Sequence, residues 1–196
     1  MVHSNGAFRS GILRMALHFN AEMPSSDRSP DYIMKEKAID PRVRIGHVHL
    51  KVANLKRALD FYCGILGFEL TQRYGEEAAF VSAGGYHHHI GLNTWESRDG
   101  SPPPHGTTGL YHFAILYPTR AALAGALRRL MQANVSLEGA SDHGVSEALY
   151  LSDPDGNGIE LYWDRLRESW PRDANGQIEM FTRRLDLEHL LAEAEG

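Results

Sequence analysis

The sequence has 196 residues and a net charge of −5 at pH 7, with 42% hydrophobic and 23% charged residues. This composition is typical of a globular protein with a buried core, and the mild acidity without a basic cluster argues against a nucleic-acid partner. No apolar run approaches the roughly 18 residues that a membrane span requires, so we expect no membrane partner. The single cysteine, Cys63, excludes an intrachain disulfide and favours a reducing, cytoplasmic setting.

Residues 21–42 are rich in proline, serine and charged side chains, which predicts a linker. Together with the residues before them they form a predicted N-terminal extension, residues 1–42. We expect a folded domain at residues 43–164 and, after it, a C-terminal tail at 165–196 with a short terminal helix.

The first part of the predicted domain contains one helix and four strands. Residues 43–52 alternate between apolar and polar side chains, as a half-buried strand does. In residues 54–67 the apolar side chains recur on one helical face, and Asn54 is placed to cap the N-terminus of that helix. Three short strands are expected after the helix, at residues 68–74, 77–83 and 87–95, and the last of them begins with three consecutive histidines.

The same order of elements starts again at residue 109. A strand is predicted at 109–118 and a helix at 119–134, whose first turn Thr119 can cap. Three further strands are expected at residues 135–140, 146–153 and 158–163. We therefore predict an α+β fold of two βαβββ repeats, residues 43–95 and 109–164, which form one curved eight-stranded sheet that encloses a metal-binding cup.

Matching positions of two such repeats face each other across a pseudo-twofold axis. His47 matches His112, and Phe80 matches Tyr150. With one extra residue allowed in a turn, His89 matches Glu160. The predicted symmetry therefore brings three histidines and one carboxylate together from distant parts of the sequence.

Three of these residues form a set that is suited to a metal. Two imidazoles and one carboxylate, with the other coordination positions open, suit a non-haem Fe(II) that binds an organic substrate and dioxygen. His47, His112 and Glu160 supply that set, and the chain has no thiol cluster of the kind that structural zinc sites often use. His47 or His49 taken alone can also be an ordinary strand histidine, whereas an unpaired buried carboxylate at Glu160 would be costly.

Three segments carry a resemblance to a known family: IGHVHLKVANLKRALDFYCGILGFEL, GGYHHHIGLNTW and DHGVSEALYLSDPDGNGIELYWDR. The chain resembles the vicinal oxygen chelate (glyoxalase/bleomycin resistance/dioxygenase) superfamily and, within it, the extradiol ring-cleaving dioxygenases of the catechol 2,3-dioxygenase type. The resemblance implies a homodimer that opens the ring of a catechol-type aromatic beside its diol, in aromatic hydrocarbon catabolism. It also implies Fe(II), with Mn(II) as an alternative, and O2 as co-substrate. The metal ligands that it implies are His47, His112 and Glu160.

The resemblance assigns roles to further residues. His89 resembles the acid/base histidine of these enzymes, and Tyr150, which precedes Glu160 by ten residues, resembles a tyrosine that hydrogen-bonds a substrate oxygen. His143 resembles another catalytic histidine that borders the substrate. His88 is the neighbour of His89 in the substrate-binding set, although strand alternation is expected to turn its side chain to the opposite face of the sheet. The chain departs from many extradiol enzymes in having room for one cup where they have two.

Two rival functions fit the same fold. In a glyoxalase-type metal-dependent lyase or isomerase, His89 would be a fourth protein ligand. In a metal-free protein that binds a small molecule such as an antibiotic, the ligand set would usually be missing. Bound metal and oxygen uptake distinguish these alternatives.

The tail beyond the repeats contains the large aromatic residues Trp170 and Phe181. Three arrangements are open for them: they cover the cup as a lid, they pack against a second subunit, or they complete the core. The sequence alone does not choose among these arrangements.

Overall fold

The structure is a computed structural model, and it describes residues 38–195. The chain divides into two units, residues 1–44 and 45–196. Most of the predicted N-terminal extension therefore lies outside the described residues. The fold described below is that of the second unit.

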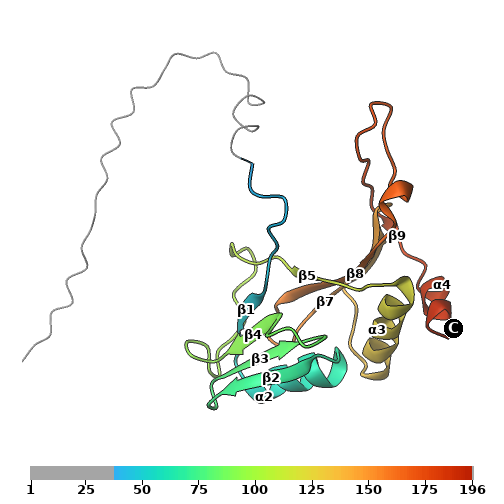
Figure 1. The fold of residues 1–196 in the computed structure, drawn as a ribbon. Coiled ribbons are helices and arrows are strands. Elements are labelled where there is room, and N and C mark those ends of the chain that lie inside the picture. The colour runs from blue at the N-terminus through green and yellow to red at the C-terminus, as the bar shows by residue number, and fades with distance from the viewer. Residues whose placement is uncertain (1–37, 196) are drawn as a thin grey trace, which may run out of the picture. The chain divides into compact units, whose positions relative to one another are not determined.

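The first repeat forms a four-stranded sheet with one helix (Figure 1). Its elements are β1 (Val48–Lys51), α2 (Leu55–Leu59), β2 (Glu69–Tyr74), β3 (Ala78–Ser82) and β4 (Ile90–Asn93). Helix α2 continues into a π-helical segment, η1 (Asp60–Ile65). As predicted, the Asn54 side chain caps the N-terminus of α2, since it accepts a hydrogen bond from the backbone N–H of Arg57 at 2.9 Å. The strand order is β1-β4-β3-β2, in which β1 and β4 are parallel and the other neighbours are antiparallel.

The second repeat has the same order of elements. They are β5 (Phe113–Leu116), α3 (Arg120–Gln132), β6 (Gly139–Asp142), β7 (Ser146–Ser152) and β8 (Gly158–Asp164). A short strand from the tail, β9 (Arg183–Arg184), extends this sheet to the order β5-β8-β7-β6-β9. The remaining elements are η2 (Arg167–Ser169), α4 (Leu187–Ala192) and η3 (Glu193–Glu195).

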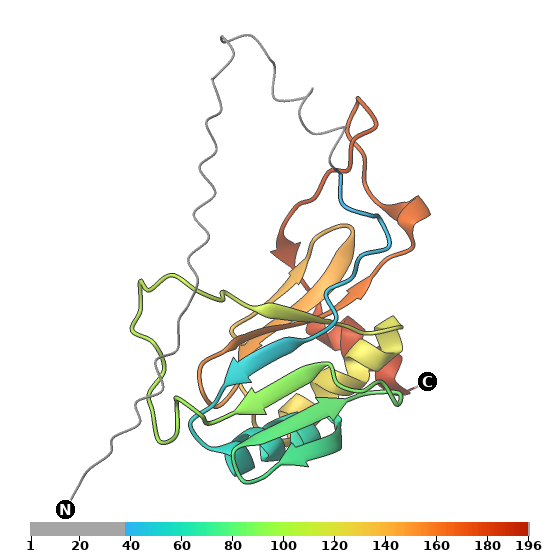
Figure 2. The ribbon, with the colours of Figure 1, turned by 60° about the vertical axis from the view of Figure 1, so that its left-hand side comes forward.

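The predicted fold class of two βαβββ repeats is confirmed. All eight predicted strands are present, and hydrogen bonds distribute them between a four-stranded and a five-stranded sheet. Strands β1 and β5 each lie at the edge of their own sheet (Figures 1 and 2). Four strands begin clearly later than predicted: β1 at Val48 rather than residue 43, and β5 at Phe113 rather than residue 109. Strand β6 begins at Gly139 rather than residue 135, and β4 begins at Ile90, after the three histidines.

A single hydrophobic core joins the two repeats. Its fully or nearly buried members come from both helices and both sheets, and include Leu55, Ala58, Leu59, Leu92, Leu123, Leu127, Leu130, Leu149 and Leu161. Helix α2 contacts β4, and α3 contacts β8. In β8 the buried side chains alternate with half-buried ones from Gly158 to Tyr162, so the face of this strand that is turned away from the core carries Glu160.

The tail completes the core. Leu185 and Leu190 are buried in it, and α4 contacts α3. Among the described residues, none of the helices has the length and apolar character needed to cross a membrane.

Candidate active site

His112 and Glu160 lie together at the start of two neighbouring parallel strands. His112 immediately precedes β5, and the Nε2 atom of its ring lies 3.1 Å from Glu160 Oε2 on β8. Both side chains are partly buried, with 30% and 15% of their surface exposed. Ile159 and Leu161, on either side of Glu160, are buried in the core, so alternation turns the carboxylate to the opposite face of the sheet.

Gly158 allows the close approach of these two strands. A Cβ atom at this position would overlap the carbonyl oxygen of Tyr111 and lie 3.1 Å from the Cβ of His112. The absence of a side chain at the first residue of β8 therefore lets Glu160 lie beside His112.

Tyr150 and His143 extend the pair into a connected set of four side chains. Tyr150 on β7 is directly opposite Glu160 in the antiparallel register, and its hydroxyl donates to Glu160 Oε1 at 2.9 Å. The Nε2 atom of His143 lies 2.8 Å from the same hydroxyl. Burial raises the pKa of Tyr150, and the hydrogen bond to the charged Glu160 raises it further. Its phenol is therefore protonated at neutral pH.

The histidines of the first repeat form a second group. The ring of His47 lies 4.4 Å, centroid to centroid, from that of His88, and His88 in turn lies 5.0 Å from Phe80. His49 contacts the edge of Phe80 at 5.9 Å. The pKa of His49 is lowered, mainly by burial and to a lesser extent by the charge of His47. The pKa of His88 is also lowered, mainly by burial and to a lesser extent by the neighbouring histidines.

The expectation that His88 points to the opposite face of the sheet is wrong. Its ring packs against His47 and Phe80, and the Nδ1 atoms of His87 and His88 are 2.7 Å apart. The physical reason is that the chain turns between Ser82 and His89, with two glycines in the left-handed region, so strand alternation does not apply to this segment.

His89 is held by one of its two ring nitrogens. Its Nδ1 atom lies 2.9 Å from the hydroxyl of Ser82 and accepts from the backbone N–H of Ala83 at 3.3 Å. The backbone of His89 is bonded on both sides, to Val48 and to Val81, which fixes the residue at the entrance to β4. These contacts leave Nε2 as the ring nitrogen that is available to a substrate.

The structure thus brings together two of the three predicted metal ligands. His112 and Glu160 are in contact with each other, whereas His47 packs against His88. Among residues 38–195, no three histidine, cysteine or acidic side chains are gathered as a ready metal site.

Two partners of the site residues were not predicted. Ser82 has a signal in the sequence, since it lies two residues after Phe80 on one strand and therefore shares its face. Phe181, whose backbone carbonyl oxygen lies 3.0 Å from His143 Nδ1, has none, because the contact is made by the main chain.

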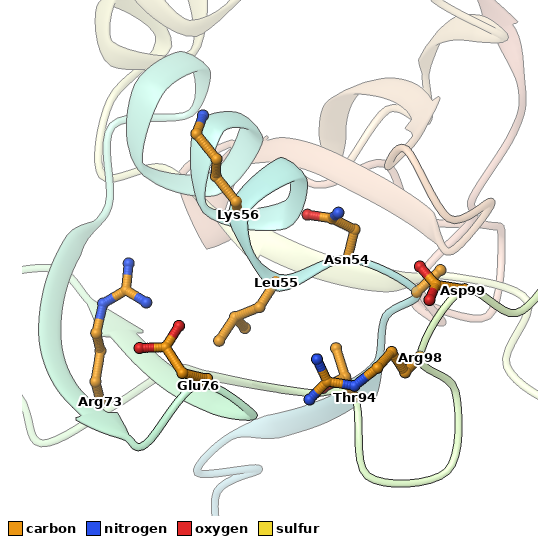
Figure 3. A pocket seen from close by; sticks show the side chains of 9 residues that line it. Asn54, Leu55, Lys56, Arg73, Glu76, Thr94, Arg98 and Asp99 are labelled. Atoms are coloured by element: carbon orange, nitrogen blue, oxygen red, sulfur yellow. The ribbon is translucent and has the colours of Figure 1, made fainter.

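Two hollows elsewhere on the surface contain none of the predicted site residues. One, of about 200 Å³, is surrounded by charges of both signs, as Figure 3 shows; Arg73 and Glu76 lie at one side of it, and Arg98 and Asp99 at the other. The other, of about 490 Å³, is lined by the tail and by β6, β7 and β8. Charged side chains make up most of the lining of both, and the second reaches Asp142, the neighbour of His143 in the sequence.

Comparisons with known proteins agree with this fold. A family model described as the Glyoxalase/Bleomycin resistance protein/Dioxygenase superfamily matches residues 44–161. The chain is similar to a catechol-2,3-dioxygenase from Bacillus subtilis (strain 168), with 43% identity over 158 residues, which cover 80% of this chain and 54% of the relative. The chain therefore spans about half the length of that relative.

A more distant similarity links the chain to the biphenyl-2,3-diol 1,2-dioxygenase 2 of Rhodococcus globerulus, at 27% identity over 135 residues, or 69% of each chain. Among solved structures, a glyoxalase/dioxygenase from Nostoc punctiforme is similar with a TM-score of 0.55 and 18% identity, over 74% of this chain and all of that chain. A lactoylglutathione lyase from Agrobacterium tumefaciens is similar with a TM-score of 0.50 and 21% identity, over 63% and 96% of the two chains. At these identities the two structures support the fold alone.

Proposed function

The chain belongs to the glyoxalase/bleomycin resistance protein/dioxygenase superfamily, and from this premise we propose that it is an extradiol dioxygenase, which opens the ring of a catechol-type aromatic beside its two hydroxyl groups. The observation that carries the proposal is the connected set of His112, Glu160, Tyr150 and His143. The 43% identity to a catechol-2,3-dioxygenase supports this activity over the lyase and binding-protein alternatives.

The proposed metal is Fe(II), with Mn(II) as an alternative, and its proposed ligands are His47, His112 and Glu160. The donor set fits such an ion: an imidazole nitrogen and a carboxylate oxygen lie 3.1 Å apart on adjacent strands, and one carboxylate with two histidines is the set that non-haem Fe(II) oxygenases use. His47 is exposed, so its ring is accessible as the third ligand. When bound, Fe(II) would hold the diol and O2 next to each other and couple them electronically.

His89 is the proposed acid/base residue. A catechol hydroxyl must lose a proton as the diol binds, and the ring-opening steps require that a proton be returned. A histidine serves both steps because its charge changes near neutral pH. The Ser82 hydroxyl and the Ala83 N–H hold Nδ1, which leaves Nε2 as the ring nitrogen that would exchange a proton with the substrate.

Tyr150, His143 and His88 are the proposed substrate-binding residues. Because its pKa is raised, the phenol of Tyr150 keeps its proton and can donate a hydrogen bond to a substrate oxygen. His143 holds the phenol from the side opposite Glu160. His88 lies beside His47, at the first repeat's edge of the proposed site.

The predictions of a homodimer in the cytoplasm, and of a domain at residues 43–164, remain part of the proposal. The homodimer rests on the family resemblance, and the cytoplasmic setting on the single cysteine. Sedimentation of the purified protein and fractionation of cells test these two points.

Oxygen uptake tests the function directly. Iron-loaded protein is given catechol or 2,3-dihydroxybiphenyl, and the yellow ring-opened product is followed together with O2. We expect His112→Ala and Glu160→Gln to abolish both signals, whereas His105→Ala, an exposed histidine in the loop between the repeats, serves as the matched control and keeps them. Bound iron without oxygen uptake would favour the lyase, and a failure to bind any metal would favour the binding protein.

A further inference from the structure

The tail of the chain contacts the proposed catalytic set at His143, and we propose that Phe181 is a positioning residue there: its backbone carbonyl fixes the tautomer of His143 and so makes His143 Nε2 a second acceptor for the Tyr150 hydroxyl proton. The catalytic consequence rests on the proposed function. The tautomer itself depends only on the hydrogen bonds described next.

Main-chain pairing brings Phe181 to His143. Strand β9 pairs with β6, and beyond the end of this ladder the backbone N–H of Phe181 donates to the carbonyl of His143 at 3.3 Å. Between residues 171 and 179 the tail forms a hairpin, seen above β9 in Figure 1, which is closed by the bridge between Arg172 and Ile178. The hairpin therefore returns the chain to the sheet at a fixed point.

Side-chain packing then holds Phe181 in place. A Cβ atom at Gly144 would lie 2.6 Å from Cε1 of Phe181 and 2.9 Å from Cγ of Pro171, so both rings pack directly on the backbone of this glycine. The guanidinium carbon of Arg183 lies 4.1 Å from the centroid of the Phe181 ring. Because the ring is packed against these neighbours, the Phe181 carbonyl has little freedom to turn away from His143.

The carbonyl determines which ring nitrogen of His143 carries the proton. Its oxygen lies 3.0 Å from Nδ1, and a carbonyl oxygen can only accept. The Nδ1 atom is therefore the protonated one in the neutral ring, and the hydroxyl of Thr182, at 3.3 Å, is a second partner for it. Nε2 consequently presents a lone pair to Tyr150, whose hydroxyl is 2.8 Å away.

This tautomer affects Glu160. The Tyr150 hydroxyl has one proton and two neighbours that can accept it, His143 Nε2 and Glu160 Oε1. While Nε2 has its lone pair, the two acceptors compete for the proton, and the carboxylate keeps more of its charge for a metal. In the opposite tautomer Nε2–H would donate to the phenol oxygen and direct the phenol proton entirely to Glu160. By this route the tail outside the repeats contributes to the proposed site.

Two glycines offer a matched test. Gly144 and Gly176 both have φ of +78°, so alanine strains the backbone equally at either position. Only at Gly144 does the new methyl group collide with Phe181 and Pro171, since nothing lies within 4 Å of a Cβ at Gly176. Phe181→Ala is the second variant, which releases the carbonyl by removing the packed ring without any added backbone strain.

The readout is the ¹⁵N chemical shifts of the His143 ring, which differ between the Nδ1–H and Nε2–H tautomers. We expect the Nδ1–H tautomer in the wild type and in Gly176→Ala, and a mixture of tautomers in Gly144→Ala and Phe181→Ala. In the iron-loaded enzyme the last two should lose about 10-fold in kcat, the usual effect of altering an outer-shell partner, with KM unchanged.

An Nε2–H tautomer in the wild type, or unchanged ring shifts in both Gly144→Ala and Phe181→Ala, would overturn the inference. Ring shifts that change as expected in a protein that never consumes oxygen would support the tautomer and refute the proposed dioxygenase function. The two failures are therefore distinguishable.

Discussion

Glu147 on β7 allows a quantitative test of what anchors the second repeat. Its carboxylate, only 6% exposed, accepts from Arg120 Nε at 2.8 Å and from Arg165 Nη2 at 2.7 Å. Glu147→Gln keeps the shape, removes the charge, and places an amide donor against a guanidinium donor. Removing one partner of a buried ion pair costs about 3–5 kcal/mol. Because Arg120 keeps Glu193 and Arg165 keeps Asp142 as partners, we expect a lower loss, about 2–3 kcal/mol.

Glu193 supplies the control for this prediction, since it bonds the same arginine, Arg120, at 3.0 Å with 46% of its side chain exposed. Exposed pairs contribute about 0–1 kcal/mol, so Glu193→Gln should change little. Urea unfolding measures both variants as shifts in the midpoint at constant slope. Burial predicts that the two losses differ by about 1–3 kcal/mol, so losses that agree within about 0.5 kcal/mol would refute the argument.

Two further predictions concern the site and its surroundings. Gly158→Ala would force β8 away from the Tyr111 carbonyl, and we expect the iron content after loading to fall about 10-fold or more; a content equal to the wild type would contradict the proposed ligand pair. Partial burial tends to raise the pKa of Asp142, but a backbone amide and the Arg165 guanidinium outweigh it and hold the pKa below its usual value. The stability that Asp142 contributes is therefore fully present above its unfolded pKa, about 3.9, and is lost as the pH falls through the lower folded value. Acid unfolding followed by circular dichroism should accordingly show a weaker pH dependence in Asp142→Asn, and an unchanged dependence would show the shift to be absent.

Much of the fold was predictable because local signals agree with it. Thr119 caps α3 through its side chain, and the buried leucines of this helix recur at helical spacing, so both its start and its inward face follow from the sequence. The start of β6 did not follow. Residues 135–138 have strand-like composition, but the backbone N–H of Val135 bonds back to Leu130 of α3. The first backbone hydrogen bond to β7 comes from Glu138, and the paired residues begin at Gly139.

The second half of the site was more predictable than the first. Tyr150 and Glu160 are on two strands joined by a short turn, so their separation in sequence determines that they face each other. His88 follows a turn with two left-handed glycines, and its direction depends on dihedral angles that a pattern of alternation does not contain. The contribution of Phe181 was out of reach for a different reason, since any residue at that position would present the same carbonyl.

The turn between β7 and β8 connects these two halves. It sets the register of Tyr150 and Glu160, with the backbone amides of Asp155 and Asn157 bonded to Asp153 Oδ1. The same turn is bonded to the first repeat: Asp155 Oδ1 accepts from the backbone N–H of Ala53, just after β1, and from Arg57 at 2.6 Å. One five-residue loop, residues 153–157, therefore sets the register within the second sheet and is also bonded to a residue just after the end of β1. His47 precedes the opposite end of β1, so carboxylates that have no part in the chemistry anchor the strand whose start carries the proposed third ligand.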